Sequence, residues 1–170
     1  MKIFYWAPIL SNIATLKAVV NSAESLMSYS DKYNVTLINV AGEFNKFKKE
    51  NIKSNIYDLN KDLVNKDLPG VGYIKTRLSM MYIFFKSFFL LKKYLEKEKP
   101  DFIIIHLLTS LPLILYLLFN FETKCILRIS GFPKMNFFRL ALWRLCSNRI
   151  YKITCPTDLT NNYLKKYKFI

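Results

Sequence analysis

The sequence predicts an α/β fold, a three-layer sandwich built on a mostly parallel sheet. Short apolar runs alternate with longer amphipathic segments along almost the whole chain, and only four of its 170 residues are glycine. Buried strands of parallel sheets are apolar on both faces, and right-handed crossovers place helices against the sheet. So few glycines disfavour a turn-dense all-β architecture.

The first part of the chain begins with a strand, a helix and a second strand. Lys2–Trp6 is an apolar run typical of a buried strand, and apolar residues at helical spacing predict a helix from about Ile13 to Ser30. Tyr33–Ala41 is β-branched and apolar, which predicts a second strand. The segments that follow are shorter: a basic surface loop or short helix at Lys46–Lys53, a short third strand at Asn55–Leu59 and a loop at Asn60–Gly72.

The longest helical pattern runs from Ile74 to Lys99 and ends before Pro100, which restricts the residue that precedes it. Strand and helix then alternate to the end of the chain. The expected strands are Asp101–His106, Lys124–Ser130 and Arg149–Cys155, and the expected helices are Thr109–Asn120, Asn136–Ser147 and one from about Asp158. No repeat or linker interrupts this order, so residues 1–170 are expected to form a single domain.

Two apolar segments have an alternative interpretation. The N-terminal run has a single lysine and is interrupted by Pro8, which disfavours a signal peptide. The run from Phe102 to Phe121 is nearly long enough to span a bilayer, but His106 and Pro112 lie inside it. We interpret it as a buried strand followed by a buried helix; a membrane span is the alternative.

The charge of the chain is strongly uneven. Its net charge is +14, from 26 Lys and Arg against 12 Asp and Glu, which implies attraction to phosphates, nucleic acid or an anionic membrane. No acidic residue occurs from Thr123 to Thr157. The basic residues of that segment are Lys124, Lys134, Lys152, Arg128, Arg139, Arg144 and Arg149. They form either a solvated basic face or a contact surface for phosphates or an anionic leaflet.

The helix Ile74–Lys99 is apolar over more than one face and has basic residues interspersed. It is either an interior helix or one that lies in a membrane interface.

The cysteines and the single histidine disfavour a metal centre. Cys125, Cys146 and Cys155 have no short spacing, and with His106 they form no ligand set for zinc and no disulfide framework. We expect reduced thiols in a cytoplasmic protein, no metal and no cofactor.

Ligands of open parallel sheets bind outside the carboxyl ends of the strands. The segments expected there are Ala7–Thr15, Gly42–Glu43, His106–Thr109, Ser130–Lys134 and Pro156–Thr157. The first has no glycine for a dinucleotide fingerprint, and the chain has no Walker lysine loop, so a nicotinamide-dependent oxidoreductase is disfavoured. No helix-turn-helix, zinc or RNA-recognition motif supports a nucleic-acid binder.

Some of these strand-end residues have side chains suited to a site. Ser11, Asn12 and Thr15 either only cap the following helix or face an anionic or hydroxyl-rich ligand. His106 is either a core histidine or a functional group that exchanges protons. Arg128 ends a core strand and is expected to reach a strand-end crevice.

These segments, in this order, resemble the N-terminal, acceptor-binding half of family-4 glycosyltransferases with the GT-B fold, as found in bacterial surface-polysaccharide synthesis. The resemblance covers essentially the whole chain, although the first loop lacks the glycine that the family usually has there. The matching segments are Ala14–Ala18, Gly42–Glu43, Asp101–His106, Arg128–Gly131, Pro133–Lys134 and Cys155–Thr157.

The resemblance implies a Rossmann-like domain in which His106 lines the cleft near the reacting sugar and acts as the catalytic residue. The acceptor-binding residues that it implies are Asn12, Thr15, Glu43, Arg128, Ser130, Gly131 and Lys134. The acceptor is then a saccharide or a polyprenyl-linked sugar. The nucleotide-sugar is held by a second, C-terminal domain that is absent from these residues, so this chain alone is expected to be inactive.

The resemblance also implies a cytoplasmic location, either free or peripheral on the inner face of the plasma membrane. The alternative function is a non-enzymatic, basic, membrane-associated scaffold module.

Overall fold

The computed structural model describes residues 1–10, 14–50, 52–66, 68–70, 72–133 and 135–167. Within them, six strands form one parallel sheet in the order β3-β2-β1-β4-β5-β6. The strands are β1 Lys2–Trp6, β2 Asn34–Asn39, β3 Asn55–Asp58, β4 Phe102–Ile105, β5 Lys124–Arg128 and β6 Ile150–Thr154. The predicted α/β sandwich is therefore confirmed, and every strand pairing in the described chain is parallel.

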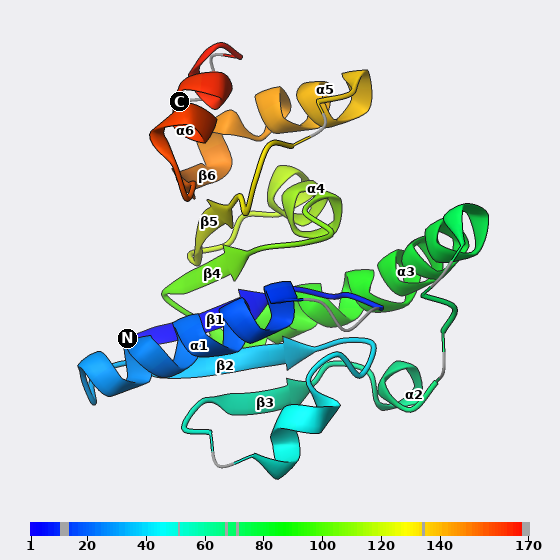
Figure 1. Ribbon diagram of the computed structural model, residues 1–170, viewed down its shortest axis with the longest axis vertical. Helices are drawn as coiled ribbons and strands as arrows, with labels where there is room; N and C mark the ends of the chain where they lie inside the picture. The colour runs from blue at the N-terminus through cyan, green and yellow to red at the C-terminus, as the bar shows by residue number, and fades with distance from the viewer. Residues whose placement is uncertain (11–13, 51, 67, 71, 134, 168–170) are drawn as a thin grey trace.

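Helices cover the two faces of this Rossmann-like sheet (Figure 1). The helix α1 packs on one face, and α3, α4 and α5 contribute to the core on the other. The longer helices are α1 Ala14–Tyr29, α3 Tyr73–Glu98, α4 Ser110–Leu118, α5 Phe137–Leu145 and α6 Asp158–Lys165; the shorter ones are η1 Asn45–Lys49, α2 Lys61–Val64 and η2 Ser147–Arg149.

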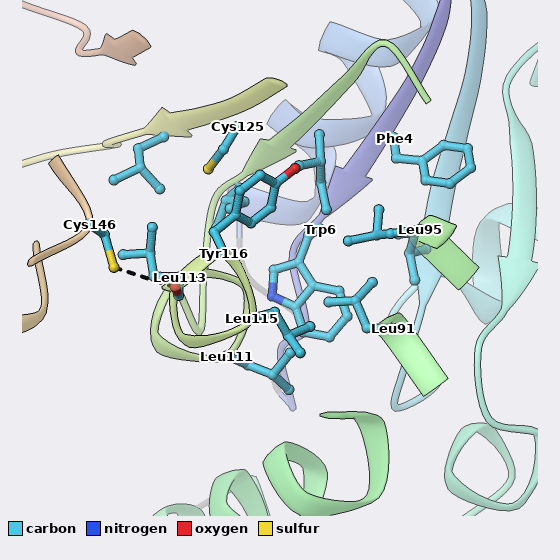
Figure 2. Close-up of a cluster of buried hydrophobic side chains, with 14 of the residues drawn as sticks. Phe4, Trp6, Leu91, Leu95, Leu111, Leu113, Leu115, Tyr116, Cys125 and Cys146 are labelled. Atoms are coloured by element: carbon cyan, nitrogen blue, oxygen red, sulfur yellow. Dashed lines mark hydrogen bonds between the residues drawn. The ribbon is translucent and has the colours of Figure 1, made fainter. Parts of the chain in front are cut away.

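The larger core lies between the sheet and the layer that contains α3 and α4. Trp6, at the end of β1, is fully buried and lies between side chains of α3 and α4, as Figure 2 shows. In the same cluster, the Cys146 thiol donates to the carbonyl oxygen of Leu113 at 3.4 Å. Apolar burial of this kind contributes about 25 cal/mol per Å². It fixes the central strands whose ends form the candidate site.

The helix α3 presents one buried row to the sheet. Ile83, Ser87, Leu91 and Leu95 recur every four residues and are almost fully buried. The backbone N–H of Lys99 donates to the carbonyl of Leu95, and Lys99 has a left-handed φ of 40° at the helix end. Because α3 lies between the end of β3 and the start of β4, it runs from the carboxyl edge of the sheet back to its amino edge.

The segment predicted as a loop at Asn60–Gly72 contains one short helix, α2. The Asn60 side chain accepts hydrogen bonds from the backbone N–H groups of Asp62 and Leu63, a regular N-terminal cap. Leu63 and Val64 are buried, which holds this turn against the body of the protein. The cap signal is present in the sequence, but four residues are too few to show helical periodicity.

The run from Phe102 to Phe121 divides into β4 and α4, as predicted. Among the described residues, no helix combines the length and the apolarity needed to cross a bilayer.

Two substitutions on α3 test the orientation of this helix. Leu91→Ala removes a fully buried side chain and is expected to lower the free energy of unfolding by about 2–5 kcal/mol. Phe89→Ala, at a side chain 64% exposed, is expected to change it by less than about 0.5 kcal/mol. Urea denaturation followed by circular dichroism measures both; equal losses would contradict this orientation.

Candidate functional site

The candidate site lies where the strand order reverses, between β1 and β4. The backbone N–H of His106 donates to the carbonyl oxygen of Trp6 at 2.9 Å, which extends the β1–β4 ladder to the histidine. The Trp6 indole N–H donates to the carbonyl oxygen of Leu108 at 3.4 Å. Leu108 has a left-handed φ of 45°, which is strained for a bulky residue. The loop after β4 is thus held in an unusual turn at the reversal point, where ligands of such sheets bind.

His106 is a buried imidazole without a full set of partners. It is 7% exposed and stacks on the Tyr5 ring, with ring centroids 5.7 Å apart. Its Nε2 has no hydrogen-bond partner in the part of the chain that the structure describes. Burial, together with the positive charge of Arg128, lowers the pKa of His106 to about 4. At neutral pH the imidazole is therefore uncharged and can exchange hydrogen bonds with a hydroxyl group.

His106 lines a depression of about 410 Å³ between α1 and the carboxyl ends of β4, β5 and β6, which we call the polar depression. Its polar side chains are those of Thr15, His106, Arg128, Ser130 and Thr154. Four of them, Thr15, His106, Arg128 and Ser130, are predicted site residues, so these four lie around one hollow. Ala14 and Ala18, one turn apart on α1, complete its wall with small side chains. The hollow offers neutral hydroxyl and imidazole groups and one guanidinium.

A second hollow, which we call the aromatic depression, adjoins the first and has a volume of about 510 Å³. His106, Ile129 and Ser130 line both hollows. Gly131 lies in the second, together with the exposed ring of Phe138 and the buried ring of Trp143. Both hollows have polar and apolar side chains in their linings and they share one histidine; the second differs in its aromatic rings.

Glu43 lies elsewhere. It lines a separate hollow of about 300 Å³ beside the loop after β1, and it does not line either depression around His106. Its carboxylate accepts hydrogen bonds from the backbone N–H groups of Val40 and Ala41 at 3.1 and 2.7 Å. Burial raises the pKa of Glu43 to about 7, although these hydrogen bonds oppose the shift. In the structure Glu43 holds the turn after β2.

Two of the predicted site residues, Asn12 and Lys134, lie outside the described residues, as does Ser11. Sequence reasoning also missed members of the site. Thr154 enters the polar depression because β6 is the neighbour of β5, and Trp143 reaches the aromatic depression from α5. The small residues Ala14 and Ala18, four apart, were the available signal for a hollow beside α1.

The three thiols differ in exposure. Cys125 and Cys146 are buried, and burial raises the pKa of the Cys125 thiol to about 12 and that of Cys146 to about 11. Cys155 is half-buried and lines the polar depression. No group of three His, Cys, Asp or Glu side chains in the described ranges has the arrangement of a metal site.

No protein-family model matches this chain, and no curated protein matches its sequence significantly.

Because His106 is the single histidine of the chain, its ring signals in NMR spectra report on this site alone. We expect them to titrate with a midpoint near pH 4. Arg128→Gln removes the nearby positive charge and is expected to raise the midpoint, because burial alone then opposes protonation. Arg149→Gln is the matched control. Arg149 lies just before β6, at the amino ends of the strands, whereas His106 lies at their carboxyl ends. An unshifted midpoint in Arg128→Gln would show that the charge of Arg128 does not act on His106.

The pKa values of His106 and Glu43 predict opposite dependences of stability on pH. The lowered pKa of His106 contributes stability that is present above pH 6.5 and lost as pH falls towards 4. The raised pKa of Glu43 contributes stability that is present below pH 4.5 and lost as pH rises through 7.

Relative to wild type, His106→Gln should therefore lose stability as pH rises from 5 to 6.5, and Glu43→Gln should gain it. Urea denaturation at stepped pH measures both differences. If the free energy of unfolding of a variant stays parallel to that of wild type across this range, the shifted pKa of the residue replaced in that variant is contradicted.

Proposed function

We propose that the chain is the acceptor-binding half of a glycosyltransferase that moves a sugar from a nucleotide-sugar to a saccharide or polyprenyl-linked acceptor. The observation that carries the proposal is the uncharged His106, which lines a hollow together with the hydroxyl groups of Thr15, Ser130 and Thr154. Neutral donors and acceptors suit the hydroxyl groups of a sugar. The volume, about 410 Å³, lies within the usual range of small-molecule sites, roughly 300–1,000 Å³.

Arg128 accounts for the charged part of such an acceptor. It is exposed, ends β5 and lines the polar depression. A guanidinium recognises phosphate through several directed N–H groups. One cation among neutral polar groups suits a sugar that carries a phosphate link better than it suits a polyanion such as nucleic acid.

His106 is the proposed catalytic residue of this half. An imidazole that is neutral at physiological pH accepts a hydrogen bond from the acceptor hydroxyl and orients its oxygen for attack. With its pKa near 4 it is a weak base, so positioning is its main contribution. Ser130 and Thr154 line the same hollow and bind neighbouring hydroxyl groups.

The nucleotide-sugar is proposed to be held by a second domain. The departing diphosphate needs electrostatic stabilisation, and the strand ends of this chain contain no glycine-rich or Walker loop to supply it. We propose that the chain by itself binds the acceptor and transfers nothing.

A polyprenyl-linked acceptor also implies a location. Its lipid portion lies in a membrane, so the proposed function includes peripheral attachment to the anionic inner face. The aromatic depression shares His106 with the polar one, and we propose that its rings of Phe138 and Trp143 contact the first carbons of the lipid chain.

The second candidate function is a non-enzymatic, basic scaffold module at the membrane. The exposed aromatic and aliphatic side chains of α3 and α5 favour it. It differs from the first in one respect: a scaffold needs no ligand in the polar depression.

Binding of acceptor probes, followed through the ring signals of His106, tests the proposal. We expect a prenyl diphosphate-linked glucose with a short, water-soluble chain to shift these signals. Arg128→Gln should weaken binding of this probe about tenfold through loss of a charged hydrogen bond, and should leave methyl glucoside unaffected. Arg149→Gln, which changes the net charge equally, should bind both probes as wild type does.

UDP-glucose is the probe for the donor, and it should leave the His106 signals in place. A shift with UDP-glucose but none with either acceptor probe would overturn the proposal. No shift with any of the three, together with membrane binding, would favour the scaffold.

A further inference from the structure

The outer side of α3 carries a continuous row of exposed apolar side chains. Ile74, Leu78, Phe85 and Phe89 are 70, 60, 69 and 64% exposed, and Met81 is 55% exposed. At about 100° per residue, these five positions fall within one narrow stripe along the helix. The buried row that faces the sheet lies on the opposite side. We call these five residues the α3 stripe.

A row of basic residues borders the stripe. Lys75, Lys86 and Lys93 are exposed and follow one flank of the helix at intervals of 11 and 7 residues. Tyr82 lies in the same row, with the ammonium groups of Lys66 and Lys86 4.7 and 6.0 Å from its ring centroid.

No acidic residue occurs in the sequence from Leu68 to Leu95. The stripe and its lysine flank therefore form an amphipathic surface that is positive and apolar, with no negative charge from the helix itself until Glu96.

We infer that the α3 stripe docks on an anionic lipid surface, with its apolar side chains in the interface and the lysine row on the lipid phosphates. An interfacial helix has this pattern of apolar side chains flanked by lysines. The main alternative, a contact between two copies of the chain, fits it less well. A two-fold contact between copies of the chain would bring two lysine rows together without acidic partners on the stripe. Each lysine near an anionic leaflet is favourable by about 1 kcal/mol.

The position of α3 connects this surface with the candidate site. The helix begins at the carboxyl edge of the sheet, and its N-terminal turns extend past the strand ends in Figure 1. Ile74 and Leu78 therefore lie at the same edge as His106. The inference deepens the proposed function and rests on it only for the choice of the inner leaflet, because the contact itself needs no sugar.

Co-sedimentation with vesicles tests the inference. We expect the chain to bind vesicles of phosphatidylcholine and phosphatidylglycerol more tightly than vesicles of phosphatidylcholine alone. The double substitution Phe85→Ser with Phe89→Ser should weaken binding about a hundredfold, at about tenfold for each ring removed from the interface. Tyr29→Ser with Leu159→Ser, at residues 83 and 68% exposed on α1 and α6, is the control and should bind as wild type does.

The charged row is tested separately. Replacement of Lys75, Lys86 and Lys93 by Gln should weaken binding to the anionic vesicles about fivefold per residue and leave binding to neutral vesicles unchanged. Replacement of Lys17, Lys32 and Lys53 by Gln changes the net charge equally and should have a smaller effect. Urea denaturation confirms that each variant is folded.

Unchanged vesicle binding by the Phe85 and Phe89 variant would overturn the inference, and so would equal losses of binding in this variant and its control. A third contradicting result is a wild-type protein that binds no vesicles but forms a dimer, with the variant monomeric. The last result would assign the stripe to a contact between copies. Failure here is distinguishable from failure of the proposed function, because the soluble acceptor probes report on His106 in the absence of lipid.

Discussion

The pairing of β1 with β4 is the constraint on which the arrangement of this protein depends. These two strands lie at the centre of the sheet, where the chain changes direction across it, and their ladder continues to His106 through the carbonyl of Trp6. Trp6 also anchors the turn at Leu108 from within the larger core. The burial of one indole thus sets both the packing of α3 and α4 and the position of the histidine. The chemistry of the site follows from that position, because burial keeps the imidazole uncharged while Arg128 remains exposed beside it.

Most of the fold could be predicted from the sequence because the central strands β1 and β2 are buried on both faces and the longer helices have a clear apolar period. The boundary of α3 follows from Pro100, and the division of the apolar run near His106 into strand and helix follows from its polar residues. The helix α2 was missed because a single turn has no period to detect.

The candidate site was predictable only in part, because strand order is a property of tertiary pairing. His106, Arg128 and Ser130 lie at or just after the carboxyl ends of the adjacent strands β4 and β5, Thr15 lies in the first turn of α1, and all four line one hollow. Glu43 also follows a strand, but β2 is separated from β4 by β1, and its carboxylate is engaged by its own turn. Thr154 was not singled out, since nothing local in the sequence indicates that β6 pairs with β5.

The unequal burial of the three thiols has a practical consequence for this molecule. Burial raises the pKa of all three thiols, but Cys125 and Cys146 are enclosed in the core, whereas Cys155 reaches the rim of the polar depression. Thiol reagents act on the accessible thiolate, so a maleimide dye modifies Cys155 first in the folded protein. The natural sequence therefore already carries a selective labelling position beside His106, where a fluorophore or spin label can be attached without engineering a cysteine.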